Sequence, residues 1–417
     1  MFASRKAVLA LSAGTVAAGL LASPIFAQSK PASGPVARYD MRAGTVTGVG
    51  AMGKGMGSAM GMMMGGGNSG PQHELYLRLG SSQPPAKGGP KADHFMPPVA
   101  KLGKSVPLVT PQSEQGPERD DLPQMGNEKP RGRILIFWGC GEHAPKGQPV
   151  IIDLAKISAG QMPPDMWSRT VIKDWGPSLA SSKTFGRWPN SDAMGGNKAI
   201  KTDASLIGAH RVAGNYSPEI SFSLAKDFMA PLTVRTSTLP SGASMLRWDA
   251  LPDATGFYAY LFGAKQAPGG NGMGDMVMWS SSASRQFGGG FQDWLSPAQV
   301  SPLVANKTLL PGSATSCIVP TEVKAATDFR MGTLNGFGPE ENFAYPPRPA
   351  DPKAAWNLQW TARIRHRSTT SWMDMPGMNA GFGGGDGPSP AHTRPDCKTP
   401  RGIGGIMGGV LGSKSGC

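Results

Sequence analysis

The sequence predicts an all-β protein built from two antiparallel β-sandwich-like domains, which are flanked by low-complexity tails rich in Gly, Pro and Met. Three observations lead to this prediction. Short stretches in the middle of the chain alternate apolar and polar residues with the period of two that half-buried strands show. Patterns typical of helices are scarce. Gly and Pro concentrate toward the N-terminal part, with 18 Gly and 13 Pro among the 103 residues of 28–130, a level typical of irregular chain.

The first 27 residues have the three parts of a secretory signal peptide. Arg5 and Lys6 precede an apolar run from Ala7 to Leu21, and a small-residue site ends at Ala27. The run is shorter than the roughly 20 residues that cross a bilayer. We therefore expect cleavage after Ala27, a periplasmic or secreted mature chain, and no integral transmembrane span after cleavage.

The mature chain is expected to be strongly basic. The formal charge of +13 becomes +11 when the two cations of the signal peptide are removed (13 − 2 = 11). Such a charge favours anionic neighbours, for example an anionic envelope surface. The Lys and Arg residues are scattered along the chain, however, with no run of five. A basic, solvated surface is the alternative, and nucleic acid is not an expected partner.

We divide the rest of the chain into four parts. Residues 28–130 form an irregular segment with one strand near 73–79, where three leucines alternate with Tyr and Arg. A β domain covers 131–238, a second β domain covers 239–370, and a Gly/Met-rich tail covers 371–417. This division follows the shifts in composition and the places where strand patterns occur.

The first domain is expected to open with a central strand at 133–138, followed by a strand at 149–154. Further strands are expected at 219–224, where Ile, Phe and Leu alternate with Glu and Ser, and at 232–238, which is β-branched. In the second domain, strands are expected at 275–280 and at 356–365. In the latter, Trp, Leu, Ala and Ile alternate with Asn, Gln, Thr and Arg. The stretch 321–329 is expected to form two helical turns.

The stretch 239–265 carries a resemblance at the level of the fold. Its sequence LPSGASMLRWDALPDATGFYAYLFGAK resembles the second and third strands of a fibronectin type III-like sandwich. The resemblance implies that Trp248 is a core tryptophan and that Phe257, Ala259 and Leu261 face it. A Gly-rich insertion at 268–274 departs from the pattern. Modules of this fold have many functions, so no activity is implied.

Four cysteines remain after cleavage of the signal peptide: Cys140, Cys317, Cys397 and Cys417. An exported chain meets an oxidising compartment, so we expect two disulfides, for which three connectivities exist. We favour the pairing of the first with the second and of the third with the fourth. Cys140 also stands close to Glu142 and His143, a combination that can ligate zinc or activate a nucleophile. The cysteine count favours the disulfide.

Methionine is unusually frequent, with 23 residues. Met373, Met375 and Met378 follow one another closely, and His366 and His392 flank them. Thioethers at such spacing select Cu(I), so these five residues are a candidate copper site. Methionine also fills cores and accumulates in Gly-rich tracts without binding a metal.

Within the segment from Gly44 to Gly65, glycine recurs every four residues at Gly53, Gly57, Gly61 and Gly65, and again at Gly404, Gly408 and Gly412. Small residues at this spacing allow helices to approach closely in or on membranes, which predicts a glycine zipper. Glycine is a poor helix former in water. The alternative is a flexible Gly/Met tract.

The sequence has no Gly-x-Ser-x-Gly, no phosphate-binding Gly-rich loop and no His-Glu-x-x-His motif. We therefore assign no catalytic or cofactor-binding residues. We expect an exported, non-catalytic envelope or periplasmic β-sandwich protein with a structural or binding role. The alternatives are a Met-rich periplasmic copper-binding protein, a glycine-zipper membrane-associated protein, and an envelope hydrolase that uses unrecognised residues.

Overall fold

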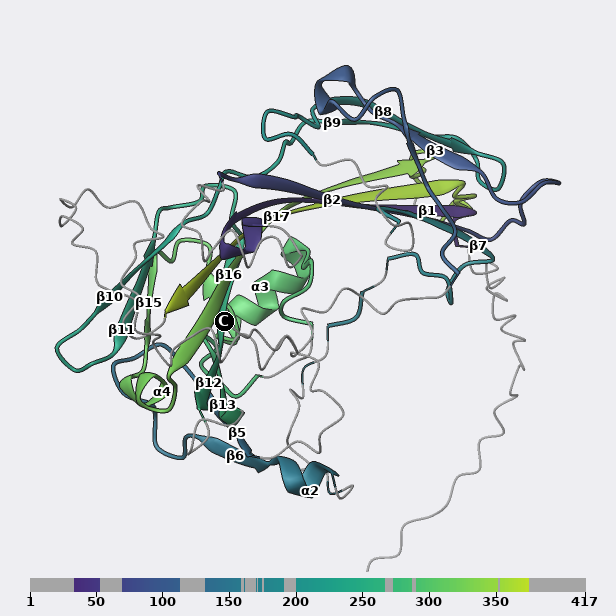
Figure 1. The fold of residues 1–417 in the computed structure, drawn as a ribbon. Coiled ribbons are helices and arrows are strands. Elements are labelled where there is room, and N and C mark those ends of the chain that lie inside the picture. Colours follow the sequence, from purple (N-terminus) through teal and green to yellow (C-terminus); the bar gives the residue numbers. More distant parts are fainter. Residues whose placement is uncertain are drawn as a thin grey trace, which may run out of the picture.

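A computed structural model of the chain describes residues 34–52, 70–112, 132–158, 161, 170, 172–174, 176–190, 200–266, 273–286, 290–351 and 353–374. Strands make up most of its regular structure, and they form three sheets (Figure 1). The few helices are short. They are η1 (Val49–Met52), η2 (Pro98–Ala100), α2 (Leu154–Ser158), α3 (Pro297–Ala305) and α4 (Thr321–Ala325).

The largest sheet has ten strands and runs through the whole fold. Its order is β6-β5-β13-β12-β16-β17-β1-β2-β7, and β14 pairs with β12. Neighbouring strands are antiparallel except for β1 beside β17 and β5 beside β13, which are parallel. The strands are β1 (Ala37–Gly48), β2 (Gln72–Ser81), β5 (Arg133–Trp138), β6 (Val150–Asp153), β7 (Thr184–Trp188), β12 (Gly256–Gln266), β13 (Met273–Ser280), β14 (Leu310–Pro311), β16 (Phe329–Tyr345) and β17 (Trp360–Asp374).

Two smaller sheets pack on the large one at different places. The three-stranded sheet has the order β10-β11-β15, and the four-stranded sheet has the order β4-β3-β8-β9. Figure 1 shows the first beside β12 and β16 and the second above β1, β2 and β17. The strands are β3 (Ala92–Phe95), β4 (Val106–Pro107), β8 (Gly208–Gly214), β9 (Ile220–Leu224), β10 (Val234–Thr238), β11 (Ser244–Trp248) and β15 (Ser316–Val319).

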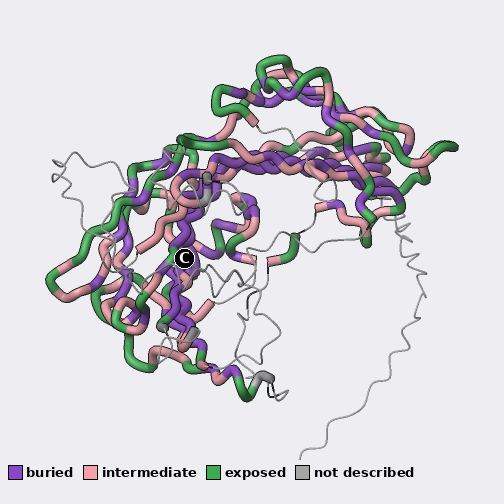
Figure 2. Tube along the Cα trace, in the orientation of Figure 1, coloured by how far each residue is buried: buried purple, intermediate pink, exposed green. Residues whose placement is uncertain are grey.

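Each small sheet covers its own hydrophobic core. Under the three-stranded sheet, Trp248 packs with Phe257 and Trp279 in what we call the three-strand core. Under the four-stranded sheet, Leu77 and Ile364 belong to the four-strand core. Figure 2 shows buried chain along the central strands, beneath the four-stranded sheet and beside the three-stranded sheet. The two cores form because each sheet has one apolar face that must leave water.

Two long strands connect the halves. Residues 256–264 of β12 pair with residues 329–337 of β16, whereas residues 340–345 of β16 pair only with β17 on this path. The register of β16 against β17 shifts between Phe337 and Glu340. A bulge of this kind bends a strand and increases its twist. The bulge therefore lies where the large sheet passes from one core to the other.

On the opposite face of β12 and β16, α3 completes a third layer. Its Val300 packs with Phe291 and Phe337. The helix begins after Ser296, whose side chain accepts a hydrogen bond from the Gln299 main-chain N–H while the Gln299 side chain accepts one from the Ser296 N–H. This capping box fixes the start of the helix. None of the helices in the described residues is long and apolar enough to span a bilayer.

The fold class is as predicted, because the chain is predominantly β. The strand expected at 133–138 coincides with β5, and the stretches 219–224, 232–238 and 275–280 contain β9, β10 and most of β13. The helix expected at 321–329 is α4, which ends at Ala325, since Phe329 already begins β16. In the stretch 356–365 the strand begins only at Trp360.

Two features of the predicted organisation need correction. Residues 28–130 were expected to hold one strand, but they hold β1, β2, β3 and β4. The boundary expected between residues 238 and 239 falls inside the β10–β11 hairpin, whose two strands pair from Val234 to Trp248. The strands of 131–238 are distributed over all three sheets because their apolar faces pack with strands from both chain ends.

Candidate functional site: an arginine–carboxylate cluster

Polar side chains cover the face of β1, β2 and β17 that points away from the four-strand core. Successive residues of a strand point to opposite faces, so Asp40 and Arg42 of β1 share a face that Tyr39 and Met41 do not. The register places Asp40 opposite Arg363 of β17 on one side. On its other side Asp40 pairs with Arg78 of β2. Opposite charges therefore lie side by side on three neighbouring strands.

We call four of these residues the arginine site: Arg42, Arg78, Arg363 and Arg365. They surround two carboxylates, Asp40 from β1 and Asp174 from a segment without regular structure. Arg365 donates from Nη2 to both carboxylate oxygens of Asp40 at 2.9 Å. Asp40 also accepts from Nε of Arg363 at 2.9 Å and from Nε of Arg42 at 3.0 Å. Asp40 is therefore completely enclosed by guanidinium groups.

Asp174 contacts all four residues of the arginine site. Its Oδ2 accepts from Arg42 and, at 3.3 Å, from Nη1 of Arg78. Its Oδ1 accepts from Nη2 of Arg363 at 3.2 Å and from Nη2 of Arg365 at 3.3 Å. The main-chain N–H of Gly176 donates to the same oxygen at 3.1 Å. A single carboxylate from a loop thus links β1, β2 and β17.

The cluster continues toward the segment that precedes α3. Nη1 of Arg42 lies 3.4 Å from Oδ1 of Asp293, and Arg365 donates to the main-chain oxygen of Trp294. The guanidinium of Arg367 lies 4.3 Å from the centre of the Trp294 ring, and it also donates to Glu74 at 3.0 Å. A cation above an aromatic ring is favourable.

Both central carboxylates stay ionised in this environment. Burial alone raises the pKa of Asp40, but Arg365, Arg42 and Arg363 outweigh it and hold that pKa below its ordinary value. Burial also raises the pKa of Asp174, and the charges of Arg42 and Arg365 again lower it. Charged groups can be buried at this density only because each faces an opposite charge.

The cluster has more cations than anions. It contains five arginines (Arg42, Arg78, Arg363, Arg365 and Arg367) and four carboxylates (Glu74, Asp40, Asp174 and Asp293). Within the described residues, the buried Nε atoms of Arg365 and Arg367 have no hydrogen-bond partner. Because guanidinium groups bind carboxylates and phosphates through paired N–H donors, this arrangement is suited to binding an anion.

A second polar arrangement lies inside the four-strand core. The hydroxyl of Tyr39 lies 2.6 Å from Nδ1 of His94, and Nε2 of His94 lies 3.0 Å from Nδ1 of His210. Nε2 of His210 lies 2.7 Å from the main-chain oxygen of Leu206, which can only accept. Each histidine therefore donates from Nε2 and accepts at Nδ1 when both rings are neutral. Burial is the main cause that lowers the pKa of His94 and of His210.

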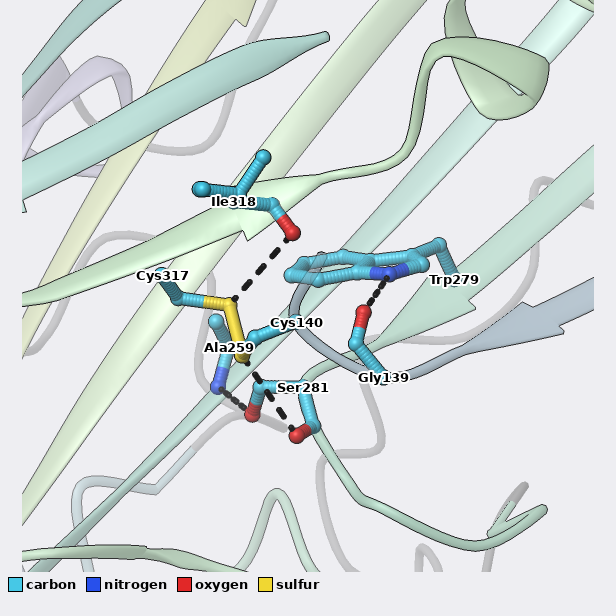
Figure 3. The surroundings of a disulfide bond; sticks show 7 residues. All are labelled: Gly139, Cys140, Ala259, Trp279, Ser281, Cys317 and Ile318. Atoms are coloured by element: carbon cyan, nitrogen blue, oxygen red, sulfur yellow. Dashed lines mark hydrogen bonds between the residues drawn. A yellow bond between two sulfur atoms is a disulfide. The ribbon is translucent and has the colours of Figure 1, made fainter. Parts of the chain in front are cut away.

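The predicted pairing of Cys140 with Cys317 is present (Figure 3). It joins the turn after β5 to β15, and so connects the ten-stranded sheet with the three-stranded sheet. Around it, the indole of Trp279 donates to the main-chain oxygen of Gly139 at 2.9 Å. The main-chain N–H of Ala259 donates to the Ser281 hydroxyl at 3.0 Å. Cys397 and Cys417 lie outside the described residues.

The neighbours of Cys140 in sequence also make structural contacts. His143 Nδ1 lies 3.1 Å from Oε1 of Glu322. The other carboxylate oxygen of Glu322, Oε2, accepts from the main-chain N–H of Ala144 at 2.8 Å. The main-chain oxygen of Glu142 accepts from Thr321 at 3.0 Å. The Cys-Glu-His combination is therefore part of the attachment of this turn to β15 and α4.

The predicted copper ligands are not brought together where they are described. His366 and Met373 are both in β17, seven residues apart, so they are about 23 Å apart along the strand and point to opposite faces. His366 is buried near Glu341. Met375, Met378 and His392 lie outside the described residues, and copper binding stays a prediction. Within the described ranges, no three His, Cys, Asp or Glu side chains group as metal ligands.

The segment 44–65, which was predicted to hold a glycine zipper, begins in a strand, and the repeat itself at 53–65 is not tested. Residues 44–48 belong to β1, and 49–52 form η1. A Cβ at Gly44 would collide with Glu74 and Trp294, which explains why this position needs glycine. Residues 53–65 and the glycines at 404, 408 and 412 lie outside the described residues.

Sequence reasoning did not identify the arginine–carboxylate cluster. A signal was present in β1, whose Arg38, Asp40 and Arg42 alternate with Tyr39 and Met41 and indicate a strand with one charged face. For Asp174, no local pattern marked a role. Comparisons of the chain with protein-family models, curated proteins and solved structures found no match.

Proposed function

We propose that the chain is an exported, non-catalytic β-sandwich protein of the bacterial envelope or periplasm, with a structural or binding role. The observation that carries this proposal is the Cys140–Cys317 disulfide. Its two cysteines are separated by 177 positions in the sequence and connect two different sheets. Structural disulfides persist in oxidising compartments and are rare in the cytosol, so the bond supports export, together with the signal-like N-terminus.

The strand order supports a fibronectin type III-like module as one part of this protein. In chain order, and leaving out the two-residue β14, the strands from β10 to β17 are seven. The first, second and fifth (β10, β11, β15) form one sheet. The fourth, third, sixth and seventh (β13, β12, β16, β17) lie side by side in the other. This strand order supports a seven-stranded sandwich of the immunoglobulin and fibronectin type.

Side-chain packing agrees with the same proposal. The Trp248 ring lies 5.5 Å from the Phe257 ring, and both residues are buried in the three-strand core with Ala259 and Leu261. β11 and β12 belong to opposite sheets, so the chain crosses the sandwich between them. Modules of this fold serve many purposes, so the module supports a structural or binding role without naming a ligand.

The side chains most capable of catalysis, a cysteine and two buried histidines, also support a non-catalytic role, because their contacts hold strands together. Cys140 is disulfide-bonded, and His94 and His210 connect β1, β3 and the segment before β8 through hydrogen bonds. The arginine–carboxylate cluster, which has one more arginine than carboxylates, is the place best suited to bind an anionic partner.

The proposal is tested by fractionation of cells that express the full chain from its own start codon. We expect the protein in the periplasmic or secreted fraction, with an N-terminus near Gln28 by mass spectrometry and with Cys140 linked to Cys317 in a peptide map. A matched Cys140→Ser variant shows that the linked peptide is assigned correctly. A full-length cytoplasmic protein whose Cys140 reacts with a thiol reagent would contradict the proposal.

A further inference from the structure

We propose that the arginine site binds the carboxylate group of an external ligand, and that Asp174 occupies this site from within when the ligand is absent. The proposal rests on the contacts of the site alone. It does not depend on the compartment in which the protein works or on its proposed role.

The arginine site and Asp174, the carboxylate that occupies it, come from different kinds of structure. All four arginines belong to β1, β2 and β17, which lie next to one another in the ten-stranded sheet. Asp174 belongs to a segment without regular structure, residues 172–174 and 176. Binding groups on a sheet are held in place more rigidly than a group on a loop. The arginine site can therefore persist while the carboxylate that fills it is exchanged.

The geometry of the Asp174 contacts also supports a site for a carboxylate. Both oxygens are recognised, one by Arg42 and Arg78 and the other by Arg363 and Arg365. Three of these four contacts are 3.2 to 3.3 Å long, whereas charge-assisted N–H···O bonds are typically about 2.7–2.9 Å. The arginines thus present donors to both oxygens of a carboxylate. Three of them hold Asp174 at a longer than optimal distance, whereas Arg42 is in close contact with it.

Asp40 provides the internal comparison. It contacts three of the same arginines at 2.9 to 3.0 Å, and its side chain is 1% exposed. Asp174 is 25% exposed, as is Arg78, and Arg363 is 21% exposed. Asp40 is thus the built-in counter-charge of the cluster. Asp174 lies at its solvent side, where a ligand can reach the arginines.

The positive charge of the arginine site also requires an anion at the position of Asp174. Without Asp174, the four arginines of the site would share Asp40 as their central anion, with Asp293 beside Arg42, which leaves two positive charges uncompensated at the point where the strands meet. Buried charges without partners are strongly unfavourable. Some anion must therefore occupy the position of Asp174, and the shape of the site matches a planar carboxylate. A permanent brace by Asp174 is the competing explanation, and it predicts that no external anion replaces it.

Chemical rescue distinguishes the two explanations. Asp174→Ala empties the position, and thermal unfolding is measured at pH 7.5 in sodium chloride, sodium acetate and sodium phosphate at equal ionic strength. We expect a lower melting temperature in chloride and a saturable rise of at least about 2 °C with acetate, because a ligand that binds only the folded state stabilises it. The wild-type protein should need at least about tenfold more acetate for the same rise, since Asp174 competes at high effective concentration.

Two further variants locate the effect. Asp203→Ala removes a carboxylate that pairs with Lys101 on the exposed surface, and it should show no acetate-dependent rise. Arg78→Gln in the Asp174→Ala background should remove at least half of the rise. Should Asp174→Ala fail to fold in chloride, Asp174→Asn, which keeps the side-chain shape, and refolding of both variants in acetate provide the same measurement.

The outcomes are decisive. A saturable response of the Asp174 variants to acetate supports the proposal, whether or not phosphate acts as well. A response to phosphate alone overturns the carboxylate assignment. Equal acetate sensitivity of wild type and variant overturns the idea that Asp174 occupies the site, and no response of either Asp174 variant shows that Asp174 is a permanent structural ion pair.

Discussion

Acidification from pH 7 to pH 5 is expected to destabilise the four-strand core through the His94–His210 pair. His94 is completely buried and His210 almost so. Their hydrogen-bond chain runs from the Tyr39 hydroxyl to the Leu206 carbonyl and is satisfied when both rings are neutral. If both rings were protonated, two N–H donors would face each other across 3.0 Å. The negative charge of Glu341 favours protonation of His210, but burial outweighs it and the pKa stays lowered.

The size of the effect follows from the pKa difference between the folded and unfolded states. An unfolded histidine has a pKa of about 6.5. Since the unfolded chain binds protons that the folded chain does not, the stabilisation is complete above about pH 6.5 and decreases as the pH falls. A histidine that remains neutral in the folded protein down to pH 5 loses about 2 kcal/mol between pH 7 and pH 5, so the pair loses at most about 4 kcal/mol.

Urea unfolding followed by tryptophan fluorescence at pH 7, 6 and 5 measures this loss. The matched control is the double variant with His94→Gln and His210→Gln, because an amide can donate and accept without titrating. Its free energy of unfolding should depend on pH by about 2 to 4 kcal/mol less than that of the wild type. Asp40 and Asp174 do not interfere, because their pKa values are lowered and their stabilisation is lost only below about pH 5. Equal pH dependence of both proteins would refute the reasoning.

Three further predictions follow from other contacts. Serine at Cys140 and Cys317 should cost about 5 kcal/mol in free energy of unfolding by the loop-closure model; a melting temperature that reductant leaves unchanged in the wild type would contradict this. Asp40→Asn removes the central anion of four arginines and should cost about 3–5 kcal/mol in urea unfolding; a loss below 1 kcal/mol would show that the buried charges find other partners. Gly48 has a φ of +68° and faces a main-chain oxygen of β17, so Gly48→Ala should destabilise by at least about 1 kcal/mol, whereas Gly70→Ala, where a Cβ meets nothing, should be neutral within about 0.5 kcal/mol.

Local alternation predicted many of the strands, because it depends only on neighbours in the sequence. The stretch 219–224 is apolar on one face and is found as β9, and 133–138, which is apolar throughout after Arg133, is found as β5. The disulfide between Cys140 and Cys317 was predicted from an even cysteine count in an exported chain, which is a compositional argument. What the alternation does not contain is the order of strands in a sheet. β5 lies beside β13, and β1 lies beside β17, through contacts between distant segments.

The strand β1 was not predicted because the composition of its surroundings obscured it. Residues 28–130 are rich in Gly and Pro on average, which indicates irregular chain. The stretch from Ala37 to Gly48 nevertheless contains no proline, and its first half alternates charged and apolar residues. An average over 103 residues conceals a strand of 12 residues. In the structure, all of its apolar residues up to Ala43 are buried in the four-strand core.

The missing strand is also the reason why the arginine–carboxylate cluster was not predicted. The alternation in β17 placed Trp360, Ala362 and Ile364 in a core, and they are buried there. It placed the arginines on the opposite face, where they were expected to meet solvent. A single strand reveals which residues share a face but not what covers that face. Once β1 pairs with β17 in parallel, Asp40 falls beside Arg363, 323 positions away in the sequence, and the arginine face becomes a buried site that requires anions. Asp174 supplies a second anion from outside the sheet; three of its four contacts with the arginines are longer than those of Asp40, and its side chain is more exposed.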